Sequence, residues 1–115
     1  MEHYKLPVYN TARELTVQIQ RSTQKVPRDI RITFVRDMEL AAMQIMKKIA
    51  FANYRIDSRA AFLEEALDVL EDIQISSRIL LDLGYIHEKG FAAIIRKEAE
   101  THIQLEAWRN SVLKK

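Results

Sequence analysis

Residues 62–84 read FLEEALDVLEDIQISSRILLDLG, and this stretch decides the fold class. Its apolar and small residues recur at alternating steps of four and three, the spacing of one face of an α-helix: Phe62, Ala66, Val69, Ile73, Ser76, Leu80 and Leu83. Gly84 then supplies the residue type that most often ends a helix in the left-handed conformation. The stretch therefore predicts a long amphipathic helix, which we expect at residues 58–83.

Three further segments repeat this spacing, and short connections separate them. Pro7 suits the first turn of a helix expected at 7–26, and Pro27 closes that helix because the residue before a proline avoids the α conformation. We expect Thr33 to cap a second helix at 34–54, and a fourth helix to span 88–113. Because short connections make neighbouring helices antiparallel, the predicted fold is an all-α, up-down-up-down four-helix bundle, one domain over residues 1–115.

The composition agrees with this fold class and excludes several others. With 115 residues, the chain is too short for a barrel enzyme, and 2 glycines with 2 prolines provide too few turns for a β-sandwich. The absence of cysteine excludes disulfides and thiolate metal sites. No apolar run approaches the ~20 residues that span a bilayer, and the first residues lack the apolar run of a secretory signal. We therefore expect a cytoplasmic protein with no membrane role.

The sequence offers no set of residues for catalysis. It lacks a Gly-x-Ser-x-Gly nucleophile motif and a glycine-rich phosphate loop. Metal-binding bundles of the di-iron type need Glu-x-x-His on two helices, and the chain has no such pair. Glu98 and His102 are four residues apart, so we expect a glutamate–histidine contact at the core edge, with a metal site as the alternative. We expect no enzymatic activity, cofactor or metal.

Charge is distributed unevenly along the chain, although the net charge is only +2. Residues 1–59 carry 11 basic and 6 acidic groups, whereas residues 60–86 carry 1 basic and 6 acidic groups. The basic side chains gather before and at the far end of the second helix, and we expect these to contact nucleic-acid phosphates: Arg21, Lys25, Arg28, Arg31, Lys47, Lys48 and Arg55. The alternatives are a solvated face, or pairing with the acidic third helix of a neighbouring subunit. Several helices are apolar on more than one face, which predicts a homo-oligomer.

Several short motifs make the chain resemble a known family of small four-helix bundle proteins. Leu6-Pro-Val-Tyr9 opens the first helix, and Val26-Pro-Arg28 is followed by Arg31 and Thr33. Ile49 precedes Ala52-Asn53 and Arg55, Arg78 precedes Ile79-Leu80, and Trp108 lies near the C-terminus. In this order the motifs are similar to those of the accessory variability determinant of diversity-generating retroelements. Related proteins are encoded in intervening sequences of bacterial large-subunit ribosomal RNA genes.

The resemblance implies a non-catalytic accessory protein that assembles as a homopentameric ring. It also implies binding to a retroelement reverse transcriptase and to RNA or DNA through a positively charged surface. The alternative is an oligomeric structural or interaction protein of the intervening-sequence type with no nucleic-acid role, whose basic residues serve subunit contacts.

Overall fold

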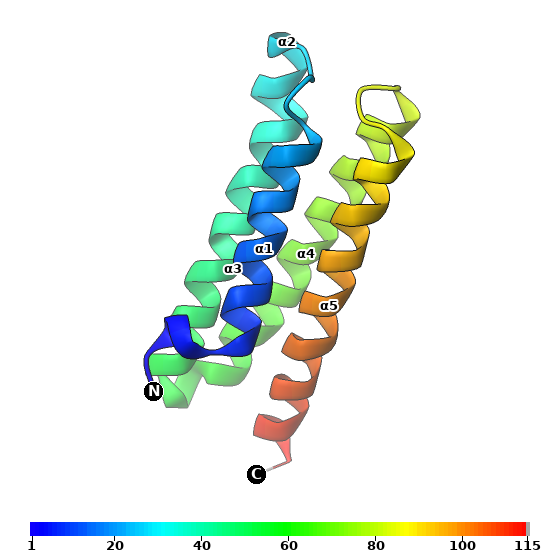
Figure 1. The fold of residues 1–115 in the computed structure, drawn as a ribbon. Coiled ribbons are helices and arrows are strands. Elements are labelled where there is room, and N and C mark those ends of the chain that lie inside the picture. The colour runs from blue at the N-terminus through cyan, green and yellow to red at the C-terminus, as the bar shows by residue number, and fades with distance from the viewer. Residues whose placement is uncertain (115) are drawn as a thin grey trace.

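Four long helices lie side by side, and each long helix runs antiparallel to the next along the chain (Figure 1). The computed structural model describes residues 1–114. The elements in chain order are η1 (His3–Lys5), α1 (Pro7–Ser22), α2 (Arg28–Ile30), η2 (Arg31–Val35), α3 (Arg36–Tyr54), η3 (Ile56–Ser58), α4 (Arg59–Asp82) and α5 (Glu88–Leu113). Within these residues there is no strand, and the all-helical prediction is confirmed.

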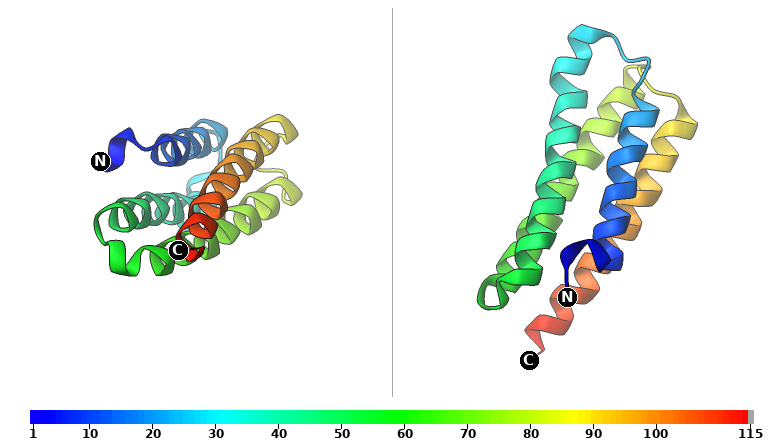
Figure 2. Two further views of the ribbon diagram at one scale, coloured as in Figure 1. Left: turned by 90° about the horizontal axis from the view of Figure 1, so that it is seen from below. Right: turned by 60° about the vertical axis from the view of Figure 1, so that its left-hand side comes forward.

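The long helices form a four-sided arrangement in which α1 packs on α3 and α5, and α4 packs on the same two helices (Figure 2). Residues 23–30 and 83–87 connect helices at one end of the bundle, here called the loop end. The N-terminus, η3 and the end of α5 lie at the opposite, terminal end. No helix within residues 1–114 is both long enough and apolar enough to cross a membrane.

The core follows the heptad positions of the sequence. Leu15 and Ile19 of α1, Ile45 of α3, Ile73 of α4 and Leu105 of α5 are all fully buried. On α4 the buried line is displaced slightly from the expected one, since Leu63 and Leu70 are buried while Phe62 and Val69 are only half-buried and Leu83 is exposed. Gly84 has a φ of 80°, so the predicted left-handed helix terminator is confirmed.

Two helix boundaries differ from the expected ones. The first helix ends at Ser22 rather than at 26, because Thr23 leaves the helical conformation, with φ −115° and ψ 11°. The Thr23 hydroxyl donates a hydrogen bond to the Ile19 carbonyl (2.7 Å). Helical backbone resumes at Arg28, six residues before the expected start at 34. Thr33 is not a cap, since it lies inside η2, one turn of π-helix, and its hydroxyl donates to the Ile30 carbonyl (2.9 Å). An N-cap residue has an extended backbone. Thr33 does not mark a helix start, because the residues that flank η2, Ile30 and Arg36, are both helical.

Candidate nucleic-acid interface

A groove lined by basic side chains opens at the loop end, between the end of α1 and the start of α5. Arg21 and Lys25 line it on the α1 side, and His87 and Lys89 line it on the α5 side. We call these four residues and the space between them the basic groove. Its volume is about 500 Å³, and no acidic side chain lines it. The groove therefore combines cations from two segments that lie more than sixty residues apart in the sequence.

A close approach of α1 and α5 fixes the floor of the basic groove. The Ser22 hydroxyl accepts a hydrogen bond from Gln18 Nε2 (2.8 Å) and donates one to the Gly90 carbonyl (3.3 Å). A β-carbon at Gly90 would lie 3.2 Å from the Ser22 β-carbon, which is tighter than ordinary packing. Glycine therefore favours this close approach, because a larger residue would require Ser22 to shift by a few tenths of an ångström. The contact between the two helices holds Arg21 and Lys89 on facing walls.

The electrostatics of the basic groove favour an anion. Among the side chains described, Arg21, Lys25 and Lys89 form no ion pair, so their charges are not neutralised within the chain. The first backbone N–H groups of α5 also lie at this end, and they carry the partial positive charge of a helix N-terminus. Exposed Glu88 in the first turn of α5 offsets part of this charge.

The structure divides the seven basic residues expected from the sequence into two groups. Arg21, Lys25, Arg28 and Arg31 lie at the loop end, and Lys47, Lys48 and Arg55 lie toward the terminal end. The nearest members of the two groups in the sequence are Arg31 and Lys47, and at 1.5 Å per residue they lie roughly 24 Å apart along the bundle. The seven side chains therefore do not form one continuous surface on a single chain.

Three of these seven side chains contact other groups of the protein. The half-buried Arg31 guanidinium donates a hydrogen bond to the Thr23 carbonyl, at the end of α1. Lys48 forms an ion pair with Glu65 of α4 (3.2 Å). The Arg55 guanidinium lies over the Phe51 ring, with 4.6 Å from its central carbon to the ring centroid. Arg28 is exposed, and no ion pair involving it forms within residues 1–114.

Arg59, which follows the second basic cluster in the sequence, stabilises a helix end. Its Nε donates to the Ala52 carbonyl (2.7 Å) and its Nη2 donates to the Asn53 carbonyl (3.0 Å). These carbonyls belong to the last turn of α3, where intrahelical donors run out. The guanidinium also lies 5.6 Å from the centre of the half-buried Trp108 ring. Arg31 and Arg59 thus both donate hydrogen bonds to backbone carbonyls at the C-terminal end of a helix, Arg31 at α1 and Arg59 at α3.

His87 and Lys89 are the groove residues that sequence reasoning missed. They are isolated in the sequence, so they do not form a cluster with Arg21 and Lys25 there. The signal that could have found them is topological, because an antiparallel four-helix bundle places the start of its fourth helix beside the end of its first. Charge clusters have to be sought across that contact as well as along the chain.

The expected contact between Glu98 and His102 does not form, because the His102 ring instead lies 3.7 Å from Glu106. The Glu98 side chain is buried on α5, and burial raises its pKa, an effect that nearby His102 opposes and Glu71 reinforces. Within residues 1–114, no three potential metal ligands of the His, Asp and Glu types come together.

Comparison with known proteins identifies one relationship. The model of a family described as 23S rRNA-intervening sequence protein matches residues 4–107. The match covers all four long helices except the end of α5. No curated protein sequence matches the chain.

Proposed function

Because this chain belongs to the 23S rRNA-intervening sequence protein family, we propose that it is a non-catalytic, homo-oligomeric bundle that binds nucleic acid. The observation that carries the proposal is the basic groove, in which Arg21, Lys25 and Lys89 face a volume of about 500 Å³ with no acidic lining residue. Phosphates attract clustered lysine and arginine side chains without any need for base recognition. Exposed Arg28 lies at the same end of the bundle and extends the positive surface.

The test is a titration of the purified protein into fluorescently labelled, structured RNA, followed by anisotropy. Reversing two groove charges, Lys25→Glu with Lys89→Glu, is expected to weaken binding at least tenfold. The matched control makes the same charge change at the other end of the bundle, with Lys47→Glu and Arg55→Glu. Circular dichroism establishes that each variant keeps its helices. Equal affinities for the wild type and the groove variant would refute the assignment of the groove.

The resemblance to accessory variability determinants supports two finer proposals. One is that the oligomer is a pentamer, which light scattering tests through the mass of the assembly relative to the 13.5 kDa chain. The other is that a retroelement reverse transcriptase is a partner, tested by co-purification of the two proteins with and without RNA. An assembly of another size, or a reverse transcriptase that does not co-purify, would remove the corresponding proposal and leave the basic groove unaffected.

A second candidate function is that of an oligomeric structural or interaction protein without a nucleic-acid role. It is favoured by large apolar side chains that a single bundle leaves in solvent, among them Leu40 (52% exposed), Ile75 (56%) and Ile103 (68%). Exposed apolar patches mark protein interfaces. An oligomer that fails to bind RNA even at low salt would favour this candidate over the first.

A further inference from the structure

An aromatic side chain, that of Tyr85, lines the basic groove beside its cations. The turn that ends α4 fixes its position. Gly84 adopts a φ of 80° and its N–H donates to the Leu81 carbonyl (2.9 Å), while the Tyr85 N–H donates to the Leu80 carbonyl (2.9 Å). These two hydrogen bonds form a Schellman motif, which ties the residue after the glycine to the helix end. Ile86 is buried in the core, so the backbone of Tyr85 is anchored on both sides.

The chain itself makes little use of the Tyr85 ring. The residue is half-buried, because it packs against the core and also lines the groove. Within residues 1–114 the Tyr85 ring contacts no other aromatic ring, and no guanidinium lies over it. The other three tyrosines of the chain all contact the His3 ring at the terminal end. Tyr85 therefore offers an aromatic surface to a ligand of the groove.

The basic groove is too narrow for a nucleic-acid duplex. It lies where α1 packs against α5, and the axes of packed helices are ~8–10 Å apart. The major groove of duplex DNA alone is ~12 Å wide, so a whole duplex does not fit between these helices. The groove volume of about 500 Å³ lies in the range of pockets that hold a small molecule, ~300–1,000 Å³. An unpaired nucleotide is a ligand of that size.

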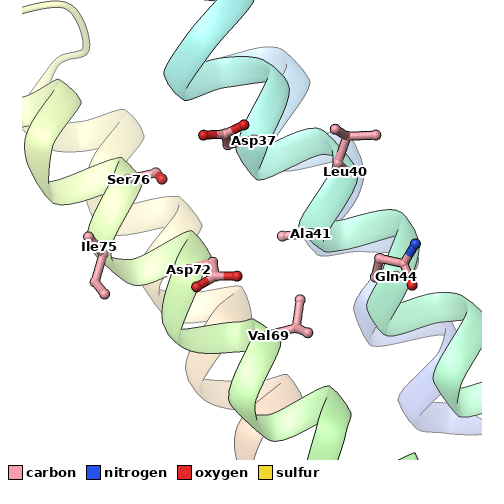
Figure 3. A pocket seen from close by; sticks show the side chains of 8 residues that line it. All are labelled: Asp37, Leu40, Ala41, Gln44, Val69, Asp72, Ile75 and Ser76. Carbon is pink, nitrogen blue, oxygen red and sulfur yellow. The ribbon is translucent and has the colours of Figure 1, made fainter.

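The side of the bundle formed by α3 and α4 disfavours nucleic acid. A groove of about 470 Å³ separates these two helices, and Figure 3 shows Asp37 of α3 across it from Asp72 of α4. No basic side chain lines this groove, and neither aspartate forms an ion pair within residues 1–114. The two carboxylates repel phosphate. A strand that reaches the bundle is therefore directed to the side formed by α1 and α5, where the basic groove lies.

We propose that the basic groove binds an unpaired nucleotide of single-stranded RNA, whose base stacks on the Tyr85 ring while the groove cations contact the phosphates on either side. Unpaired bases expose their flat faces, and stacking on an aromatic ring tolerates any base. The inference rests on the nucleic-acid binding of the proposed function and adds the form of the ligand. That form is a loop, a bulge or a strand end, in place of a paired stem.

The test compares two forms of one RNA by fluorescence anisotropy. The probes are a short labelled RNA without self-complementarity and the duplex of that strand with its complement. Because only the unpaired strand can stack a base on Tyr85, the wild type is expected to bind it about tenfold more tightly than the duplex. The structured RNA that tests the groove charges contains unpaired loops, so it supplies the same ligand.

Substitution of Tyr85 separates stacking from charge. Tyr85→Leu keeps an apolar side chain against the core but removes the flat ring, so affinity for the single strand should fall about tenfold. Duplex affinity should stay unchanged, and so should the slope of log affinity against log salt, because no charge is lost. Tyr85→Phe keeps the ring and should bind like the wild type. The matched control is Tyr54→Leu, at a tyrosine that is 58% exposed at the terminal end, and it should also bind like the wild type.

The outcomes distinguish failure of the inference from failure of the proposed function. A wild type that binds the duplex as tightly as the single strand, or Tyr85→Leu with wild-type affinity for the single strand, overturns the inference and leaves nucleic-acid binding intact. A wild type that binds neither form refutes both. The comparison of the two RNA forms uses the wild-type protein, so it remains decisive even if circular dichroism shows that Tyr85→Leu loses its helices.

Discussion

Removing the three permanent charges of the basic groove should change how RNA affinity depends on salt. The variant carries Arg21→Gln, Lys25→Gln and Lys89→Gln, which remove three cations from the groove walls. Each phosphate contact contributes about 0.9 to the slope of log affinity against log salt for a duplex, and about 0.7 for a single strand. If all three cations contact phosphates, the slope of the variant should be shallower than that of the wild type by roughly 2 to 3.

This difference is large enough to measure by anisotropy at 50, 100 and 200 mM salt. Over this fourfold range the wild-type affinity should fall roughly 40-fold more than the variant affinity, if the RNA contact is to a duplex. The control variant, Lys47→Gln with Lys48→Gln and Arg55→Gln, removes the same charge at the far end of α3 and should keep the wild-type slope. A groove variant with the wild-type slope would refute the reasoning, above all if the control variant lost slope instead.

Three further predictions concern stability. Arg59→Met removes the hydrogen bonds to the Ala52 and Asn53 carbonyls, and should lower the free energy of unfolding in urea by about 2 kcal/mol. Gly90→Ala places a β-carbon 3.2 Å from the Ser22 β-carbon, and this overpacking should outweigh the better helix propensity of alanine by about 1 kcal/mol, seen as a lower Tm. Glu98→Gln should stabilise the folded protein at neutral pH, because burial raises the Glu98 pKa. A raised pKa means that the folded state binds the proton more tightly than the unfolded state does. The free energy of unfolding of the wild type therefore falls as pH rises from the ordinary glutamate pKa through the raised pKa of Glu98. Below this pH range the stabilising effect of glutamine disappears.

Different results would contradict each of these expectations. An Arg59→Met variant as stable as the wild type would mean that water replaces the guanidinium at the end of α3. A higher Tm for Gly90→Ala would show that Ser22 moves aside and that the helices need not approach closely. If Glu98→Gln instead destabilised the protein at neutral pH, the ionised carboxylate would have to be stabilised by a cation in the folded state.

The helices were predictable because their signals are local. The alternating steps of four and three identify a buried face whatever the neighbour is, and Pro7 and Gly84 mark boundaries through their own backbone preferences. The boundaries near Thr23 and Thr33 were wrong because the chain leaves the helical conformation at Thr23 and resumes it at Arg28. The threonine hydroxyls do not mark these boundaries, since Thr11 and Thr16 bond to carbonyls of the preceding turn inside α1 without ending it.

The candidate site was predictable only in part. Arg21 and Lys25 are neighbours along the chain, so their cluster was visible, whereas Lys89 joins them through the packing of α5 on α1. The roles of the arginines were also hidden. Arg31 and Arg28 look equivalent in the sequence, yet Arg31 donates a hydrogen bond to the Thr23 carbonyl at the end of α1 and Arg28 remains in solvent. The difference depends on where the chain turns, which composition and spacing do not encode.

The π-helical turn between α2 and α3 sets the direction in which Arg28 points. A π turn holds one residue more than an α turn, so it changes the angular phase between the helical segments on its two sides. If residues 31–35 were wound as an α-helix with none removed, Arg28 would be rotated by about 100° about the axis relative to the buried face of α3. The extra residue therefore rotates α2 relative to α3. The side of α2 that faces solvent is set independently of the side of α3 that packs in the core.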